Sequence, residues 1–139
     1  MTHDLHSIVA GIDVSKFHLD AAVCGLTQTL HIGYGTEGLA QLLNWLGKHR
    51  VNLVVLEATG GYEYDLINCL NEAGISFHLA NPRQVRDFAR ATDQLAKTDK
   101  IDAQVIANYG QILRVLATPM PSKIRLKLRE YITCYRQLT

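Results

Sequence analysis

The chain has 139 residues, of which 47% are hydrophobic and 19% are charged. This composition excludes a disordered protein, and the length suffices for one domain with a buried core. No apolar stretch approaches a membrane span and no basic leader precedes a cleavage site, so we predict a cytoplasmic protein without a membrane partner. The three cysteines form no C-x-x-C pair and the six histidines are scattered, which argues against a disulfide framework and a zinc site.

The net charge of +1 conceals a strong asymmetry along the chain. Residues 1–80 carry a formal charge of −5, and residues 81–139 carry +6. A basic half beside an acidic half is typical of a protein that contacts a polyanion through the basic half. We therefore expect a nucleic acid as partner.

Three strands are expected first along the chain. Residues 7–14 form a run that is apolar on both faces, which is typical of a central, buried strand. Residues 17–24 alternate apolar and polar side chains and predict a half-exposed strand, joined to the first by a tight turn. Residues 27–33 add a third strand.

Helices and strands alternate after this point. Thr36 is the expected N-cap of a helix whose leucines recur at helical spacing. Residues 51–57 return as a buried strand, a second helix is capped by Gly74, and residues 75–80 form another short strand.

The rest of the chain is predicted to be helical. Pro82 lies in the first turn of a third helix, and residues 98–117 form a fourth. Residues 123–139 carry apolar side chains in a 4-3-4-3 spacing, which indicates the start of a coiled coil and therefore a homo-oligomer, at least a dimer. We divide the chain into a folded domain, residues 1–118, and a coiled-coil segment, residues 119–139.

This order of elements indicates an α/β fold with a mixed sheet flanked by helices. Residues 7–14 and 51–57 are both apolar on two faces, so we expect them to lie adjacent and parallel at the centre of the sheet. That arrangement places Asp13 beside Glu57.

Both of these acids lie where a lone charge is unusual. Asp13 interrupts an apolar run, and burial of an unpaired carboxylate costs several kcal/mol, so a functional role is favoured over that of a turn residue. Glu57 on its own reads equally well as a solvent-exposed strand end. The carboxyl edge of parallel strands is, however, where α/β proteins place their sites.

Two further acids lie at the head of the predicted fourth helix. Asp99 follows Thr98, an expected N-cap, so a role in complementing the helix dipole suits Asp99 at least as well as catalysis does. Asp102 is expected to point toward the sheet, because it falls inside the apolar face of that helix. That face is defined by Ile101, Val105, Tyr109, Ile112 and Leu116.

Two carboxylates on the sheet and two on a covering helix would suit a pair of Mg²⁺ ions, with Mn²⁺ as a substitute. Two such ions roughly 4 Å apart activate an attacking oxygen and stabilise a leaving one in phosphodiester chemistry. We therefore expect Mg²⁺ as the cofactor.

Four segments together resemble successive motifs of the DEDD insertion-sequence transposases, a group that includes the pilin-gene invertases. The resemblance spans residues 7–117. It implies a RuvC-like, ribonuclease-H-type domain whose D-E-D-D metal site is Asp13, Glu57, Asp99 and Asp102. The segments are Gly11-Ile-Asp-Val-Ser-Lys16, Leu56-Glu-Ala-Thr-Gly-Gly-Tyr62, Asn81-Pro-Arg-Gln-Val-Arg86 and Lys97-Thr-Asp-Lys-Ile-Asp-Ala103.

The resemblance also implies partners beyond this sequence. Members of the family continue through a coiled coil into a second domain with a nucleophilic serine, and they act with a structured guide RNA. The sequence ends at Thr139 with no match to that second domain. We therefore expect a DNA-acting domain that is incomplete for recombination by itself.

Basic side chains surround the proposed acids. Arg83, Arg86 and Arg90 fall on one stripe of the third helix, which suits a ladder of phosphate contacts or simply a solvated face. Lys97 and Lys100 flank Asp99 and would either steer a nucleic-acid backbone or relieve acidic repulsion.

Three functions follow from these patterns. The first is a metal-dependent DNA strand-cleaving domain of a transposase or site-specific recombinase. The second is a junction-resolving nuclease that acts without a partner domain, and the third is a non-catalytic, dimerising module that binds nucleic acid.

Overall fold

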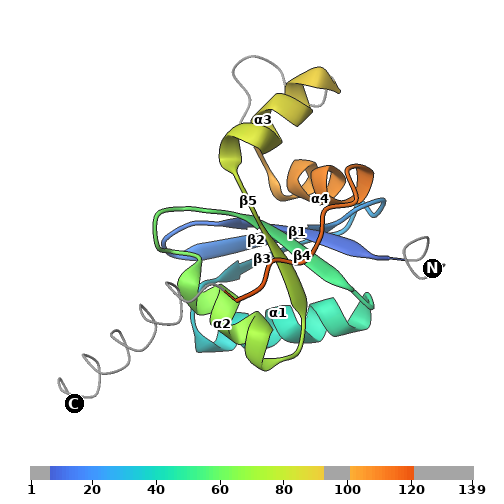
Figure 1. Cartoon of the computed structure of the whole chain (residues 1–139). Coiled ribbons are helices and arrows are strands. Elements are labelled where there is room, and N and C mark those ends of the chain that lie inside the picture. Colours follow the sequence, from blue (N-terminus) through green and yellow to red (C-terminus); the bar gives the residue numbers. More distant parts are fainter. Residues whose placement is uncertain (1–6, 93–100, 121–139) are drawn as a thin grey trace.

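The computed structural model describes residues 7–92 and 101–120. Within them, five strands form one sheet in the order β3-β2-β1-β4-β5, with helices on both of its faces (Figure 1). No helix in these described ranges is both long and apolar enough to span a bilayer. The elements are β1 (Val9–Val14), β2 (His18–Val23), β3 (Thr29–Gly33), α1 (Thr36–Lys48), β4 (Leu53–Glu57), α2 (Tyr64–Glu72), β5 (Ser76–Ala80), α3 (Pro82–Ala91) and α4 (Ala103–Ile112).

The sheet is mixed, as the sequence predicts. β1 pairs with β2 and β2 with β3 in antiparallel fashion, whereas β1, β4 and β5 run parallel to one another. The two strands that are apolar on both faces, β1 and β4, are neighbours at the centre of the sheet. The expected parallel pair is therefore confirmed.

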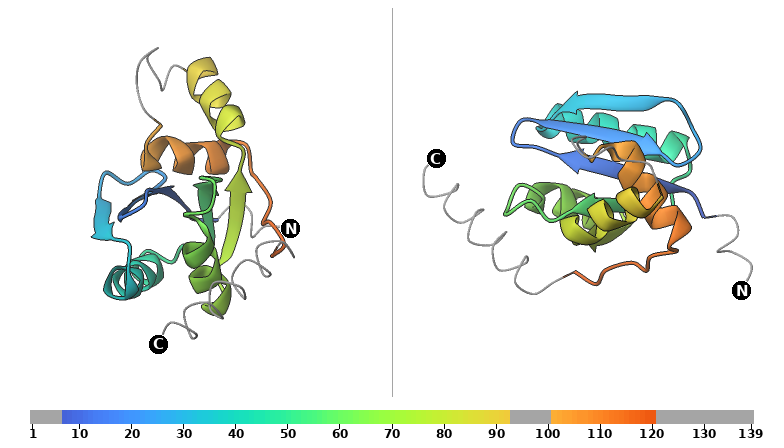
Figure 2. Two further views of the ribbon diagram at one scale, coloured as in Figure 1. Left: turned by 90° about the vertical axis from the view of Figure 1, so that its left-hand side faces the viewer. Right: turned by 90° about the horizontal axis from the view of Figure 1, so that it is seen from above.

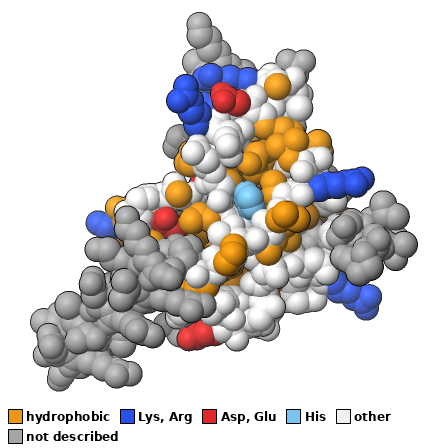
Figure 3. Space-filling model, in the orientation of Figure 1, with side chains coloured by type: hydrophobic (Ala, Val, Ile, Leu, Met, Phe, Trp, Pro, Cys, Tyr) orange, Lys and Arg blue, Asp and Glu red, His pale blue; other side chains and the backbone are white. Residues whose placement is uncertain are grey.

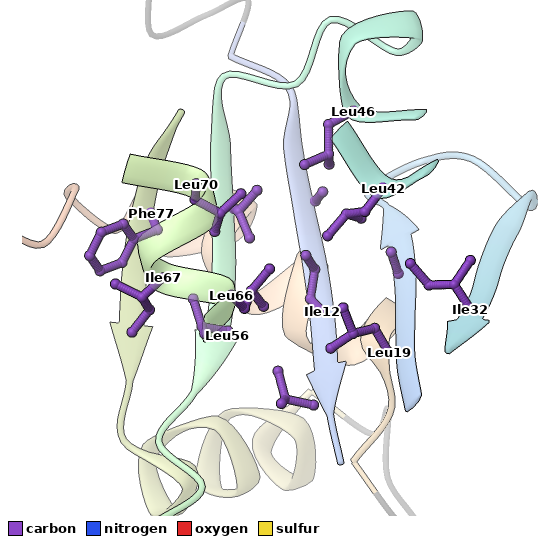
Figure 4. Packing of buried hydrophobic residues seen from close by; sticks show 14 of the residues in the cluster. Ile12, Leu19, Ile32, Leu42, Leu46, Leu56, Leu66, Ile67, Leu70 and Phe77 are labelled. Atoms are coloured by element: carbon purple, nitrogen blue, oxygen red, sulfur yellow. The ribbon is translucent and has the colours of Figure 1, made fainter. Parts of the chain in front are cut away.

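One face of the sheet is covered by α1 and α2 (Figure 2). Alternate residues of the strands, among them Ile12 on β1 and Leu56 on β4, point into this layer and are fully buried. They pack against the apolar stripes of both helices, including Leu42 and Leu66 (Figure 4). This layer is the larger of the two hydrophobic cores and fixes the positions of the central strands.

The opposite face is covered by α4, with α3 standing beyond the end of β5 and packing on α4 (Figure 1). The contact between α4 and β1 is unusually close. A Cβ atom added at Gly11 would lie 2.2 Å from the carbonyl oxygen of Ala103 and 2.4 Å from the amide nitrogen of Ala107. Only glycine at this position of β1 lets the helix backbone approach so closely.

The fourth helix is shorter than predicted. It begins at Ala103 with Asp102 as its N-cap and ends at Ile112, whereas the sequence indicated residues 98–117. Ile112 and Leu116, expected on the buried face, are 58% and 82% exposed. The apolar spacing continues past the helix end, so periodicity alone could not locate that end.

Two smaller expectations have different outcomes. The N-cap of α1 is Gly35 rather than Thr36, and it makes no side-chain cap hydrogen bond. The predicted coiled coil, residues 123–139, lies outside the described residues.

The segment after α4 returns along the edge strand β5. The Thr118 amide donates to the Phe77 carbonyl oxygen at 2.7 Å, and the Leu79 amide donates to the Thr118 hydroxyl at 3.0 Å. The Leu116 carbonyl oxygen lies 2.7 Å from Nδ1 of His78. Part of the outer edge of the sheet is therefore hydrogen-bonded within the chain.

Candidate metal centre at the carboxyl edge of β1 and β4

Asp13 and Glu57 lie on neighbouring strands and on the same face of the sheet. The parallel register pairs Ile12 of β1 with Leu56 of β4, so Asp13 and Glu57 occupy the next position on each strand. Because side chains alternate, both acids share the face of Gly11, which α4 covers. The expected juxtaposition of the two sheet acids is present.

Asp13 is exposed, so the expectation that it interrupts the apolar run as a buried charge was wrong. The reason is the position of α4. The carbonyl oxygen of Ala103, the first helical residue, lies over Gly11, and the strand continues three residues beyond that point, to Val14. Asp13, on the face that α4 covers, is thus left exposed beside the start of the helix.

Glu57 carries the desolvation cost that was expected for Asp13. Its Oε1 atom is buried and has no hydrogen-bond partner among the described residues. Burial raises the pKa of the Glu57 carboxyl, the nearby charge of Asp13 raises it further, and Arg86 opposes both effects. Ionisation of Glu57 is therefore less favourable than that of a carboxyl group in water.

Asp102 lies at the N-terminus of α4, close to the open end of β1. Its Oδ1 accepts a hydrogen bond from the Val105 amide at 2.9 Å, which makes it the helix N-cap. Asp102 is exposed and precedes the helix, so the expectation that it lies on the apolar face of the helix was wrong. Because Ala103 packs on Gly11, Asp102 lies toward the same end of the sheet as Asp13.

The remaining predicted acid cannot be placed. Asp99 lies outside the described residues, as do Lys97 and Lys100. Within the ranges 7–92 and 101–120, no three acidic, histidine or cysteine side chains are already grouped tightly enough to hold a metal ion. The donors that are present, carboxylate oxygens with one buried and unpaired, nevertheless fit a hard divalent cation such as Mg²⁺.

The three predicted arginines lie on α3, and basic side chains gather over this helix in Figure 3. The Asn81 side chain caps the helix by accepting from the Arg83 amide at 2.8 Å. Arg83 and Arg90 are exposed, while the opposite face of the helix is buried against α4. The single stripe expected from the sequence is present, and Arg86 acts electrostatically on Glu57.

The loop that follows Glu57 is fixed by a residue that the sequence analysis missed. The Glu63 side chain is only 4% exposed, and its Oε1 accepts from the Thr59 hydroxyl at 2.6 Å and from the amides of Thr59 and Gly61. Burial acts to raise the pKa of Glu63, but these hydrogen bonds outweigh it and lower the pKa. Because Glu63 occupies two amides of this loop, they do not serve as a phosphate cradle.

A polar pair on β2 and β3 was also missed. Asp20 lies directly opposite Asp13 in the sheet register, and His31 lies directly opposite Asp20. Nδ1 of His31 is 2.5 Å from Oδ1 of Asp20, and the ring of His18 stacks on that of His31. The available signal was the His18–Asp20 alternation on one face of a half-exposed strand.

Comparisons with known proteins agree with this architecture. A family model described as a transposase, of the IS110-type DEDD class, matches residues 10–139. The pilin gene-inverting protein of Moraxella lacunata is 30% identical over 108 residues, and that of Moraxella bovis is 28% identical over 106 residues. Each alignment covers 72% of this chain and 33% of the relative, so the chain spans about a third of the length of these curated relatives.

Solved structures show the same fold. Thermus thermophilus RuvC superposes with a TM-score of 0.52 at 22% identity, covering 84% of this chain and 85% of that one. RuvC of the same organism in complex with a Holliday junction substrate gives a TM-score of 0.50 at 20% identity, covering 86% of each chain. The fold is therefore RuvC-like, of the ribonuclease-H type.

Proposed function

Because the chain belongs to the DEDD transposase family, we propose that it is the metal-binding catalytic domain of a DNA transposase or site-specific recombinase. The family and the RuvC-like fold support a nuclease- or recombinase-type enzyme. The finer proposal is a D-E-D-D site made by Asp13, Glu57, Asp99 and Asp102, with Mg²⁺ as the cofactor.

One observation carries this proposal: a buried oxygen of Glu57 that has no partner among the described residues, on the strand next to a second carboxylate. Burial and the charge of Asp13 both disfavour the ionised form of Glu57. A divalent cation would relieve both effects, because it supplies the positive charge and the missing ligand contact. Without a cation, two like charges at this position on adjacent strands would repel each other.

Each side chain of the proposed metal site would have a distinct role. Asp13 and Glu57 would hold the cation from the sheet, and Asp102 would add an oxygen from the start of α4. When bound, a pair of Mg²⁺ ions supplies activation of the attacking oxygen and stabilisation of the leaving oxygen. Arg86 would balance the excess acidic charge near Glu57 when no cation is bound.

DNA is the proposed substrate. The phosphate backbone would be contacted by the α3 stripe, Arg83, Arg86 and Arg90, together with Lys97 and Lys100. One of the solved RuvC structures is a complex with a Holliday junction, which supports branched or strand-exchanging DNA as the form acted on.

Complete recombination would require more than this domain. The curated relatives are about three times as long as the matched part, which supports a second domain after residue 118. We propose that this second domain supplies the serine nucleophile, that residues 119–139 begin a coiled coil that joins two copies, and that a structured guide RNA acts with the assembly.

The metal site is tested by isothermal titration of Mn²⁺ into the wild type, Asp13→Asn and Asp65→Asn. Asp65 is an exposed acid on α2, on the other face of the sheet, and serves as the matched control. We expect Asp13→Asn to weaken Mn²⁺ binding at least tenfold, because carboxylate oxygens are the preferred ligands. Equal Mn²⁺ binding by all three proteins would contradict the proposed metal site.

Cleavage assays separate the alternatives. Cleavage of branched DNA by the isolated chain would favour the junction-resolving nuclease that needs no partner domain. DNA binding that survives Asp13→Asn, without cleavage by the wild type in Mn²⁺, would favour the non-catalytic module.

A further inference from the structure

A row of polar side chains crosses the sheet away from the acidic pair. Asp13 on β1, Asp20 on β2 and His31 on β3 are consecutive partners in the antiparallel register. Directly opposed residues of antiparallel strands project from the same face. The row therefore lies on the face of the candidate metal centre and extends it in the direction opposite to β4.

The Asp20–His31 pair lies on the surface rather than in the core. The two side chains are 47% and 64% exposed, with Nδ1 of His31 2.5 Å from Oδ1 of Asp20. The ring of His18 lies parallel to that of His31, with centroids 5.0 Å apart and planes inclined by 16°. The imidazole of His31 is thus oriented from two sides while it remains accessible to a ligand.

The charge arrangement of this row is unfavourable for the sheet alone. Asp13 and Asp20 are like charges directly across a strand pair, which is destabilising. An uncharged residue at either position would make the pairing of β1 with β2 more stable. A histidine that donates to Asp20 offsets part of this repulsion and leaves its second ring nitrogen, Nε2, for another contact.

The spacing of the strands determines how far His31 lies from Asp13. Adjacent strands lie about 4.8 Å apart, so β3 is about 10 Å from β1. That separation is too large for His31 to share a cation with Asp13. It equals the rise of roughly three nucleotides of B-form DNA, because each nucleotide advances a strand by about 3.4 Å.

We propose that His31, oriented by Asp20 and stacked on His18, contacts a backbone phosphate of the DNA strand a few nucleotides from the acidic pair. The inference rests on the proposed function and adds a second anchoring point for the same substrate. Arg86 lies near Glu57 on one side of the acids, and His31 lies on the other. The DNA would cross the carboxyl edge of β1 from α3 toward β3.

The chemistry of the contact is a charge-assisted hydrogen bond. The Nδ1–H of His31 donates to Asp20, so Nε2 is the nitrogen that meets the phosphate. With a second proton taken from solvent, the ring also carries Nε2–H, which donates to an oxygen of the phosphate. Asp20 is a positioning residue in this scheme and does not touch the DNA.

The test measures binding of a fluorescein-labelled DNA duplex by fluorescence anisotropy, with Ca²⁺ in place of Mg²⁺, over a range of about 50 to 200 mM salt. We expect His31→Ala to weaken binding about tenfold and to reduce the slope of log affinity against log salt by about 1. Asp20→Asn should weaken binding by a smaller factor, because the ring loses its orientation but remains present.

The matched control is His49→Ala. His49 caps the end of α1 on the other face and packs edge-on against Trp45, so its loss should leave both affinity and salt slope unchanged. If the wild type does not bind DNA, both the proposed function and this contact are wrong. If the wild type binds DNA and His31→Ala shows the same affinity and salt slope, only the contact is wrong.

Discussion

Asp13 and Glu57 are neighbours with opposite surroundings. Asp13 projects beyond the start of α4 into solvent, whereas Glu57 is half-buried with one oxygen unpaired among the described residues. Burial and the charge of Asp13 raise the pKa of Glu57, so its ionisation is costly. In the proposed site, a bound cation would offset that cost.

The substitution Glu57→Gln should stabilise the cation-free protein at neutral pH. The pKa of Glu57 is raised in the folded state, so the folded state binds its proton more tightly than the unfolded state does. Stability is then highest below the ordinary pKa and falls as pH rises through the raised pKa. We expect a gain on the order of 1 kcal/mol, or about 4 °C in Tm, at neutral pH and no gain near pH 4.

Calorimetry over this pH range measures the effect, with Glu37→Gln, an exposed acid in the first turn of α1, as control. Saturating Mg²⁺ should raise the Tm of the wild type more than that of Glu57→Gln. A wild type and a Glu57→Gln variant with the same Tm at every pH would contradict the assigned cost of ionisation.

The juxtaposition of Asp13 and Glu57 could be predicted from the sequence, but their surroundings could not. Apolar runs on both sides of Asp13 and before Glu57 indicate adjacent parallel strands, and this was correct. Asp13 is exposed because α4 begins no earlier than Ala103. That start is set by the cap at Asp102 and not by the apolar periodicity. The alternation of His18 and Asp20 marks one face of β2, but the pairing of Asp20 with His31 depends on the strand register, which that alternation does not specify.

At the scale of the elements, α4 packs its backbone directly on β1. Gly11 and Gly110 provide the space: an added Cβ at Gly110 would lie 2.4 Å from Cγ2 of Val55. Two points of contact along one helix fix both its distance from the sheet and its direction. The position of Asp102 at the head of α4 is a consequence of this packing.

Replacing Gly11 by alanine should therefore displace α4. The added methyl group would clash with the helix backbone at Ala103 and Ala107, which cannot rotate away as a side chain could. We expect a loss of about 2–3 kcal/mol in the free energy of unfolding and weaker Mn²⁺ binding. Chemical denaturation and isothermal titration measure the two effects.

Gly47→Ala is the matched control for this substitution. Gly47 lies in α1 with no atom within 4 Å of an added Cβ, so alanine there should stabilise the protein by about 0.5–1 kcal/mol. A Gly11→Ala protein as stable as the wild type, with unchanged Mn²⁺ affinity, would show that α4 is not held as closely as described.

At the scale of the whole molecule, strand order brings distant parts of the chain together. The chain runs through β1, β2 and β3 before it returns to place β4 beside β1. The α/β class and the mixed sheet could be predicted from alternating apolar runs. The closeness of α4 to β1 could not, because it depends on two glycines that no periodicity marks as contacts.

The hydrogen bonds of Thr118 to β5 have a consequence for solubility. A strand with unpaired amides and carbonyls at the rim of a sheet invites pairing with another copy, and Thr118 occupies part of that rim on β5. A chain ending at Val115 should form larger species as its concentration rises, whereas one ending at Met120 should stay monomeric. Light scattering distinguishes the two, and identical masses would contradict this reading. The short segment that follows α4 would then protect part of this edge of the sheet against pairing with another copy.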